Sequence, residues 1–396
     1  MSIGNKCRRR KMCYHMGMVM KEKIVQWVQR RVRLPVAGLD ISDRSIKYAR
    51  FVAYPRRIIG APRGGLGVVL AEYGEEEIPE GVVVRGVVER EDALGVVLAK
   101  VADRAGREFC ASGIVASLPE EKSFLKLIQT PRVAEDAMAG AVRWGMEGQV
   151  PLSPDDMIYD FEEIHSRGGA EDHRDAVVTA FPKEIVMSYV RAIKAAGLMP
   201  VALELESQAI IRAVARDLAE HEAIIVLDMG RTRTSFIIVA GGAILFTTTI
   251  GVGGQILEKS IMQGLGVDEV EAMRIKKEIG LSKTSHDGKL FVALLPSLAV
   301  IADELRRTIA YYLDHAAHAH EAGNAITRIV LSGGDASLYG LDTYLAVETR
   351  IPVALADPFA AWHESAGGGT PPLPYHEALA FTAAMGLALR GIRSDR

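Results

Sequence analysis

The chain has 396 residues, of which 49% are hydrophobic and 24% are charged. This composition is typical of a folded protein, and the length predicts two or more domains. The formal net charge of −3 gives the chain as a whole no electrostatic preference for nucleic acid. Its three cysteines cannot form the disulfide framework of a small secreted domain, so a reducing compartment is favoured.

The first 33 residues form a basic extension with ten Lys and Arg and a single acid, Glu22. Residues 21–34 can place their apolar side chains on one helical face and their basic side chains on the other, which suits an anionic membrane surface. A solvated tail is the alternative. Cys7, Cys13 and His15 in this segment are interpreted as incidental, because a fourth metal ligand is missing. No stretch of about 20 uncharged apolar residues follows, so no transmembrane span is expected.

The first domain is predicted at residues 34–117 and 191–222. Apolar runs predict strands at 36–41, 46–52, 82–88 and 113–117, with a Pro/Gly-rich surface stretch at 55–67 and a helix over 90–106. Residues 118–190 interrupt this domain as an α+β insertion. It comprises a helix from Val133 through Gly148, two strands at 157–164 and 176–181 around a polar tip, and a helix from Pro182 to Ala196.

The second domain is predicted at residues 223–374. It has strands at 224–227, 235–239, 243–248 and 329–331, and helices opening after Gly251, over 267–279 and over 294–319. Gly280 follows the second helix as a suitable C-terminal cap residue. A last helix at 377–390, rich in Ala and Leu, is expected to pack on a core, and residues 375–392 are assigned to the first domain.

Two similar turns stand in the two halves of the chain. Asp40 ends an apolar run and precedes Ile41-Ser42-Asp43-Arg44-Ser45, and Asp228 does the same before Met229-Gly230-Arg231-Thr232. Backbone N–H groups and hydroxyls of such turns bind phosphate oxygens, and the acids can hold Mg²⁺ through water. Together with Ser332-Gly333-Gly334 after a third strand, the two turns predict ATP held between two related domains.

In this order, the motifs resemble those of the actin-like ATPases, a superfamily with a ribonuclease H-like α/β fold. Closer similarity is to the PilM family of type IV pilus assembly. It rests on Arg143-Trp144 with the segments 147–156 and 159–160, and on 196–207, which resembles "AGL.PVAVDVES". Further matching segments are 251–254, 338–341, 357–359 and 385–390. The resemblance covers roughly residues 36–392. It implies an α/β, two-domain, actin-like ATPase fold with an inserted α+β subdomain.

The resemblance also implies roles for single residues. Asp40 and Asp228 would flank Mg²⁺, with turn capping as the alternative role. Glu206 would orient the attacking water and act with Asp228 in catalysis; an exposed carboxylate at a helix start is the alternative. ATP would contact the two turns, the glycines and a ribose-side lysine, namely Asp40, Ser42, Asp43, Ser45, Lys47, Gly230, Thr232, Thr234, Gly253, Gly254, Lys276, Gly333 and Gly334.

Three positions depart from the family pattern. Ser42 and Asp43 replace a Gly and a Ser in the first turn, so a positive φ at Ser42 would be strained and Asp43 would bring a carboxylate near phosphate. Two like charges 4 Å apart repel by about 4 kcal/mol at an effective dielectric near 20. Met273 replaces a ribose-binding Glu. Weak ATP binding with slow or absent hydrolysis is therefore expected.

Three functions remain open from the sequence. The resemblance implies a cytoplasmic, ATP-binding scaffold at the inner face of the membrane. It would serve a type IV pilus or related secretion machine and would dock the N-terminal cytoplasmic peptide of a PilN-like inner-membrane protein. Contacts with other pilus-assembly ATPases and homo-oligomers are left open. An FtsA-like filament-forming division protein would need a C-terminal membrane helix, which this chain lacks after Arg390. A sugar or acid kinase would need a further catalytic Asp, and none is evident.

Overall fold

The computed structural model describes residues 35–55, 66–164, 173–215, 218, 222–315, 325–363 and 371–392. The basic N-terminal extension, with Cys7, Cys13 and His15, lies outside the described residues. So does the polar hairpin tip expected at 165–174, except for His173 and Arg174, which begin a strand. Within the described ranges, no helix combines the length and apolarity needed to cross a bilayer.

The first domain is built on a five-stranded mixed sheet in the order β10-β6-β1-β2-β3. The first strand is antiparallel to β2 and parallel to β6, and β6 is parallel to β10. The strands are β1 (Val36–Ile41), β2 (Ser45–Pro55), β3 (Leu66–Glu77), β6 (Gly113–Leu118) and β10 (Met199–Leu205). A two-residue ladder, β4 (Val83–Val84) with β5 (Val87–Val88), replaces the single strand expected at 82–88 because Arg85 and Gly86 turn the chain with positive φ.

The second domain repeats this plan with a five-stranded sheet in the order β13-β12-β11-β14-β15. Here β11 is antiparallel to β12 and parallel to β14. The strands are β11 (Ala223–Met229), β12 (Thr234–Ala240), β13 (Ala243–Ile250), β14 (Ile326–Ser332) and β15 (Val353–Leu355). The hairpins β1–β2 and β11–β12 therefore occupy equivalent places in the two sheets, which is where the two Asp turns of the sequence lie.

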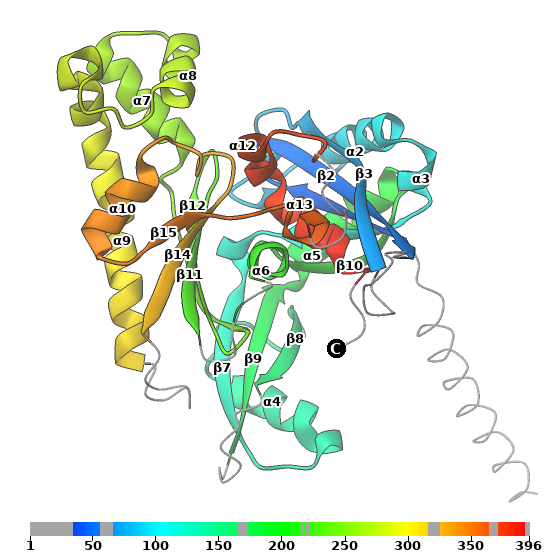
Figure 1. The fold of residues 1–396 in the computed structure, drawn as a ribbon. Coiled ribbons are helices and arrows are strands. Elements are labelled where there is room, and N and C mark those ends of the chain that lie inside the picture. Colours follow the sequence, from blue (N-terminus) through cyan, green and yellow to red (C-terminus); the bar gives the residue numbers. More distant parts are fainter. Residues whose placement is uncertain are drawn as a thin grey trace, which may run out of the picture.

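Helices cover both faces of the first sheet. On one face, α2 (Glu91–Ala105) packs against α5 (Lys183–Ala195), next to the short α3 (Arg107–Cys110), in a core that buries Phe109 and Tyr189. On the other face, α6 (Glu206–Val214) packs against α13 (Thr382–Leu389), which also contacts β1 and β2. The chain thus returns to the first domain through α12 (Tyr375–Ala378), η5 (Leu379–Phe381) and α13, as Figure 1 shows.

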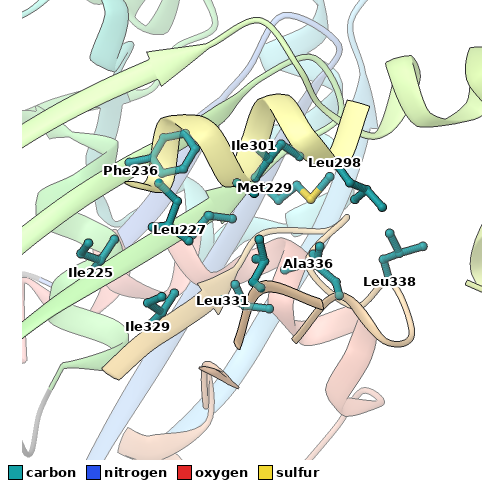
Figure 2. Close-up of a cluster of buried hydrophobic side chains, with 14 of the residues drawn as sticks. Ile225, Leu227, Met229, Phe236, Leu298, Ile301, Ile329, Leu331, Ala336 and Leu338 are labelled. Atoms are coloured by element: carbon teal, nitrogen blue, oxygen red, sulfur yellow. The ribbon is translucent and has the colours of Figure 1, made fainter. Parts of the chain in front are cut away.

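The core of the second domain lies between its sheet and the long helix α9 (Lys289–His315). Figure 2 shows Leu227, Phe236 and Leu331 from the sheet facing Leu298 and Ile301 from this helix. The other helical elements of this domain are α7 (Gly254–Leu265), α8 (Glu269–Glu278), η3 (Ser285–Gly288) and α10 (Leu341–Thr349). The short α11 (Ala360–His363) contacts β3 and α6 of the first domain instead.

The inserted subdomain has its own small sheet and core. Its strands β7 (Phe124–Pro131), β9 (His173–Pro182) and β8 (Met157–Ile164) are antiparallel in the order β7-β9-β8, and α4 (Met138–Met146) packs on one face. The segments η1 (Glu120–Lys122) and η2 (Glu135–Ala137) precede β7 and α4. In the sheets of the described residues, β7, β8 and β10 are all edge strands.

Candidate nucleotide site

A cavity of about 640 Å³ lies between the β1–β2 turn of the first domain and the β11–β12 turn of the second. The start of α6 and residues of α8 and the last helical segments complete its walls. Most of the sequence-predicted ligands of ATP come together here. Those that line the cavity are Asp40, Ser42, Ser45, Lys47, Glu206, Asp228, Gly230, Thr232 and Gly334.

The first turn is closed by hydrogen bonds of Ser42. Its hydroxyl donates to the Ser45 carbonyl at 2.9 Å and accepts from the Ser45 N–H at 3.2 Å. Ser42 is not among the described non-glycine residues with positive φ, so the strain considered from the sequence does not arise. Lys47 lies beside it, donating to the Ser45 hydroxyl at 3.1 Å and pairing with Glu75 at 3.1 Å. The turn therefore presents a hydroxyl-rich surface, and the cations Arg44 and Lys47 line the same cavity.

The second turn is supported by the start of α7. The Gly254 N–H donates to the Gly230 carbonyl at 3.1 Å, and the Gln255 N–H donates to the Arg231 carbonyl at 2.8 Å. A Cβ on Gly253 would lie 2.5 Å from the Gly230 carbonyl oxygen. Glycine is thus required at 253 because the helix N-terminus approaches the turn backbone to backbone.

The two predicted metal-side acids face the same cavity from different domains. Asp40 accepts a hydrogen bond from the Ser117 hydroxyl at 2.9 Å. Asp228 keeps part of its surface open to the cavity, yet desolvation by the surrounding protein and the negative charge of Asp40 raise its pKa to about 6. A cation bound between the two carboxylates would relieve the repulsion between Asp40 and Asp228. Among the described residues, no group of three or more His, Cys, Asp or Glu could hold a metal ion.

Asp43 does not occupy the position expected from the sequence. Its carboxylate accepts hydrogen bonds from the backbone N–H groups of Arg85 and Gly86, at 3.1 Å and 2.9 Å, and it does not line the cavity. Asp43 therefore caps the turn between β4 and β5, and the hypothesis that it repels phosphate stays a prediction. The sequence did not distinguish a carboxylate near phosphate from a cap of the β4–β5 turn, because that turn is distant from Asp43 in the chain.

Four other predicted ligands support the site from behind instead of lining it. The buried Thr234 hydroxyl donates to the Val252 carbonyl at 2.6 Å. Gly333, at φ +95°, lies so close to Met229 that a Cβ would sit 2.4 Å from its carbonyl oxygen. Gly253 and Gly254 support the second turn, and a Cβ on Gly254 would overlap the Asp335 carboxylate.

Lys276, the sixth predicted ligand outside the lining, is paired within the second domain. It contacts Glu258 at 2.6 Å and Asp335 at 2.5 Å. Glu258 is buried and also pairs with Arg231 at 3.1 Å. The expected ribose-side lysine is therefore part of an ion-pair network, and Met273 from the same helix reaches the cavity wall instead.

Two arginines of the second turn were missed as site residues from the sequence. Both Arg231 and Arg233 line the cavity, and Arg233 reaches across to the first domain. Its Nη2 lies 2.8 Å from Glu206 Oε1, and its Nη1 lies 2.8 Å from Glu121 Oε1. The signal was present in the alternation Arg231-Thr232-Arg233-Thr234. The remaining lining residues that were not predicted are Arg44, Glu75, Glu77, Ile78, Ile210, Ala380 and Ala383.

A second cavity, of about 830 Å³, opens on the other side of α6. The edge strands β8 and β10 both contribute to it, together with Gly242 to Ile244 around the start of β13. Helix α6 separates the two cavities: Glu206 and Ile210 line the first, and Gln208, Ile211 and Arg212 line the second. We call this second cavity the groove. Its further lining includes Ile158, Asp160, Glu162, Leu203, Glu204 and Arg390.

The geometry agrees with what comparison with known proteins shows. Residues 38–392 match the family described as Type IV pilus assembly protein PilM. The chain belongs to the PilM family. Among solved structures, a chain of the PilM-PilN type IV pilus biogenesis complex superposes with a TM-score of 0.73 at 22% identity, covering 92% of this chain and 100% of that one.

Two further structures confirm the α/β actin-like fold of this PilM-family chain. The ethanolamine utilization protein EutJ from Carboxydothermus hydrogenoformans has a TM-score of 0.52 at 14% identity, covering 89% of this chain and 88% of that one. MreB5 of Spiroplasma citri bound to AMPPNP has a TM-score of 0.51 at 14% identity, covering 85% and 96%. The actin-like fold class implied by the family resemblance is thereby confirmed, and the family match does not favour an FtsA-like protein.

Proposed function

We propose that this protein is a cytoplasmic, ATP-binding scaffold of type IV pilus assembly, which docks the N-terminal cytoplasmic peptide of a PilN-like inner-membrane protein. The observation that carries the proposal is a pair of cavities on the two sides of α6, one between phosphate-type turns and the other between two free strand edges. The PilM-PilN complex supports the peptide partner. The AMPPNP complex of MreB5 supports a nucleotide in the first cavity.

ATP is proposed to place its phosphates between the two turns. Ser42, Ser45 and Thr232 offer hydroxyl donors, and Lys47, Arg44 and Arg231 offer positive charge. Asp40 and Asp228 would hold Mg²⁺, because their carboxylates converge from two domains and repel each other without a cation. The ion would neutralise part of the triphosphate charge. Isothermal titration calorimetry with ATP, with and without Mg²⁺, tests this, and no binding at millimolar ATP would contradict it.

The groove is proposed to hold an extended peptide. In the sheets of the described residues, β8 and β10 each have one edge that is not paired with another strand, and adjacent apolar side chains can receive alternate side chains of an added strand. Ile158, 41% exposed on β8, is one such contact. Because the partner's segment begins in the cytoplasm and continues into a membrane anchor, docking would hold this protein at the inner face of the membrane.

A point substitution in the groove provides the sharpest test. Ile158→Glu should weaken binding of a fluorescent synthetic peptide, taken from the N-terminus of a PilN-like protein encoded beside this gene, by about tenfold or more. A buried carboxylate without a partner is costly at an interface. Val347→Glu serves as the matched control, because Val347 is 72% exposed on α10 and does not line the groove. Equal loss in both variants, or none in Ile158→Glu, would contradict the proposed docking site.

A further inference from the structure

Arg233 forms an ion-pair cluster that crosses the nucleotide cleft. Arg233 lies in the second turn, whereas its three carboxylate partners lie on the opposite side of the cleft, outside the second domain. Glu206 and Glu121 lie 2.8 Å away, and Asp43 lies 3.9 Å away. Only 14% of the Arg233 side chain is exposed. By contrast Arg231, two residues earlier, pairs with Glu258 and Glu269 of its own domain.

Glu206 is the cavity carboxylate best suited to orient a water molecule toward a bound phosphate. Asp40 and Asp228 stand on the two turns, and Glu75 is paired with Lys47. Glu206 opens α6 at the cavity wall and is 8% exposed. Burial raises its pKa well above the usual value, and Asp40 adds to the rise while Arg233 opposes it. A buried carboxylate of raised pKa in a cleft is typical of a proton acceptor.

The Arg233 contact removes Glu206 from that role. A guanidinium 2.8 Å from a carboxylate oxygen forms a charge-assisted hydrogen bond, which opposes proton uptake by the carboxylate and occupies a lone pair of Glu206 Oε1. The position of Arg233 beside Glu206 is fixed by a second contact, because its Nη1 donates a hydrogen bond to Glu121 Oε1, also at 2.8 Å. A planar guanidinium can bridge two carboxylates in this way.

We infer that Arg233 restrains ATP hydrolysis by holding Glu206 in an ion pair across the cleft, with Glu121 as its anchor. This rests on the proposed binding of ATP between the two turns. In the hydrolysis that Arg233 holds back, Glu206 would accept a hydrogen bond from the water whose oxygen attacks the γ-phosphorus. The bond from that phosphorus to the bridging oxygen of ADP would break, giving ADP and inorganic phosphate, which retains the protons of the water apart from any released to solvent.

The anchor connects this restraint to the inserted subdomain. Glu121 belongs to η1, which directly precedes β7. Its neighbour Glu120 is buried and accepts hydrogen bonds from the Ser207 N–H and hydroxyl, at 3.3 Å and 3.1 Å. The segment η1, where the inserted subdomain begins, therefore contacts the start of α6 through Glu120 and Arg233 through Glu121. A shift of η1 would loosen Arg233 and Glu206 together.

Single-turnover hydrolysis at saturating Mg²⁺-ATP tests the inference on the full-length protein. Arg233→Gln should raise the rate constant by about tenfold or more, because oriented proton acceptors contribute factors of this size. Adding Glu206→Gln to Arg233→Gln should remove the gain. Glu121→Gln should give a smaller gain, and Arg233→Lys an intermediate one, since an ammonium cannot bridge both carboxylates in the same geometry.

Arg306→Gln is the matched control, because Arg306 is an exposed arginine of the second domain that also pairs with two carboxylates, Asp303 and Glu348. It should leave the rate unchanged. ATP affinity is measured in parallel by calorimetry. If Arg233→Gln binds ATP and hydrolyses it no faster than wild type, or if the gain survives Glu206→Gln, the restraint is overturned while ATP binding stands. If wild type binds no ATP, the proposed nucleotide function fails and the restraint fails with it.

Discussion

Replacing Asp228 with Asn is expected to stabilise the nucleotide-free protein and, at the same time, to abolish its stabilisation by Mg²⁺-ATP. In the free protein the ionised Asp228 is unfavourable, because it is desolvated and lies near Asp40. Asn has nearly the same shape but no charge, so the substitution removes the repulsion without leaving a void. In the ATP complex the same charge is needed, since it would face Mg²⁺.

The magnitude follows from the raised pKa. A rise from 3.8 to about 6 corresponds to roughly 3 kcal/mol, at about 1.4 kcal/mol for each pKa unit. Water that enters the cavity would screen the charge of Asp228, so this free energy is an upper limit. The native state binds the proton more tightly than the unfolded state, so wild-type stability falls as pH rises from about 4 through about 6. The advantage of Asp228→Asn should be complete above pH 7 and should fall to roughly half at pH 5.

Thermal unfolding at pH 5.0 and 7.5, with and without 5 mM Mg²⁺-ATP, measures both effects. Wild type should gain stability from ATP, by about 2.7 kcal/mol when the ligand is at 100 times its dissociation constant, and Asp228→Asn should gain none. Asp103→Asn is the control, because Asp103 is exposed on α2 and does not line the cavity. A lower unfolding midpoint for Asp228→Asn than for wild type at pH 7.5 without nucleotide would refute the electrostatic reasoning.

Three further predictions concern stability and can be checked by chemical denaturation. Asp43→Ser should leave ATP affinity unchanged in calorimetry and cost about 1–2 kcal/mol, because two backbone N–H groups lose a charged acceptor; tighter ATP binding would return Asp43 to the phosphates. Gly386→Ala should cost at least about 2 kcal/mol, since the new Cβ would lie 1.8 Å from the Ala209 carbonyl oxygen. Gly140→Ala on α4, which meets nothing within 4 Å, should instead gain up to about 1 kcal/mol, and a loss as large as that of Gly386→Ala would contradict the packing argument. Glu204→Ala should cost about 3 kcal/mol because it leaves two arginines without their buried partner, whereas a change below about 1 kcal/mol would show that solvent compensates them.

Local sequence patterns were sufficient for the elements that carry the two Asp turns. The strand 36–41 and the hairpin strand after it are apolar runs ended by an acid, and the helix expected at 90–106 is observed as α2, Glu91–Ala105. The fold class came from the resemblance of the ordered motifs to the actin-like ATPases, because two copies of strand, acid and turn by themselves suggest only two related domains. The strands that carry the Asp turns and the helix α2 depend on residues close together in the chain, so local sequence patterns predict them.

Four strands, β3, β7, β10 and β15, escaped prediction for a physical reason. The edge strand β7, Phe124–Pro131, mixes polar and apolar residues, since one of its faces packs on α4 and its outer edge is unpaired in the described sheet. Strand β3 follows a Pro/Gly-rich stretch and ends in three glutamates, and β10 begins with partly exposed Met199 and Val201. Edge strands carry weak local patterns because their side chains are only partly buried.

For the site, the sequence alone determined which residue types converge: an acid and hydroxyls from each turn, with glycines from the second turn and from the end of a third strand. Only the tertiary structure decided which of them line the cavity. Asp43 is drawn to the β4–β5 turn by two N–H groups 42 and 43 residues away, and Lys276 is drawn into an ion-pair network with Glu258 and Asp335. The cross-cleft partners of Arg233 were likewise invisible in the sequence. Long side chains choose partners by proximity in space and by charge, and the fold brings those partners together from distant parts of the chain.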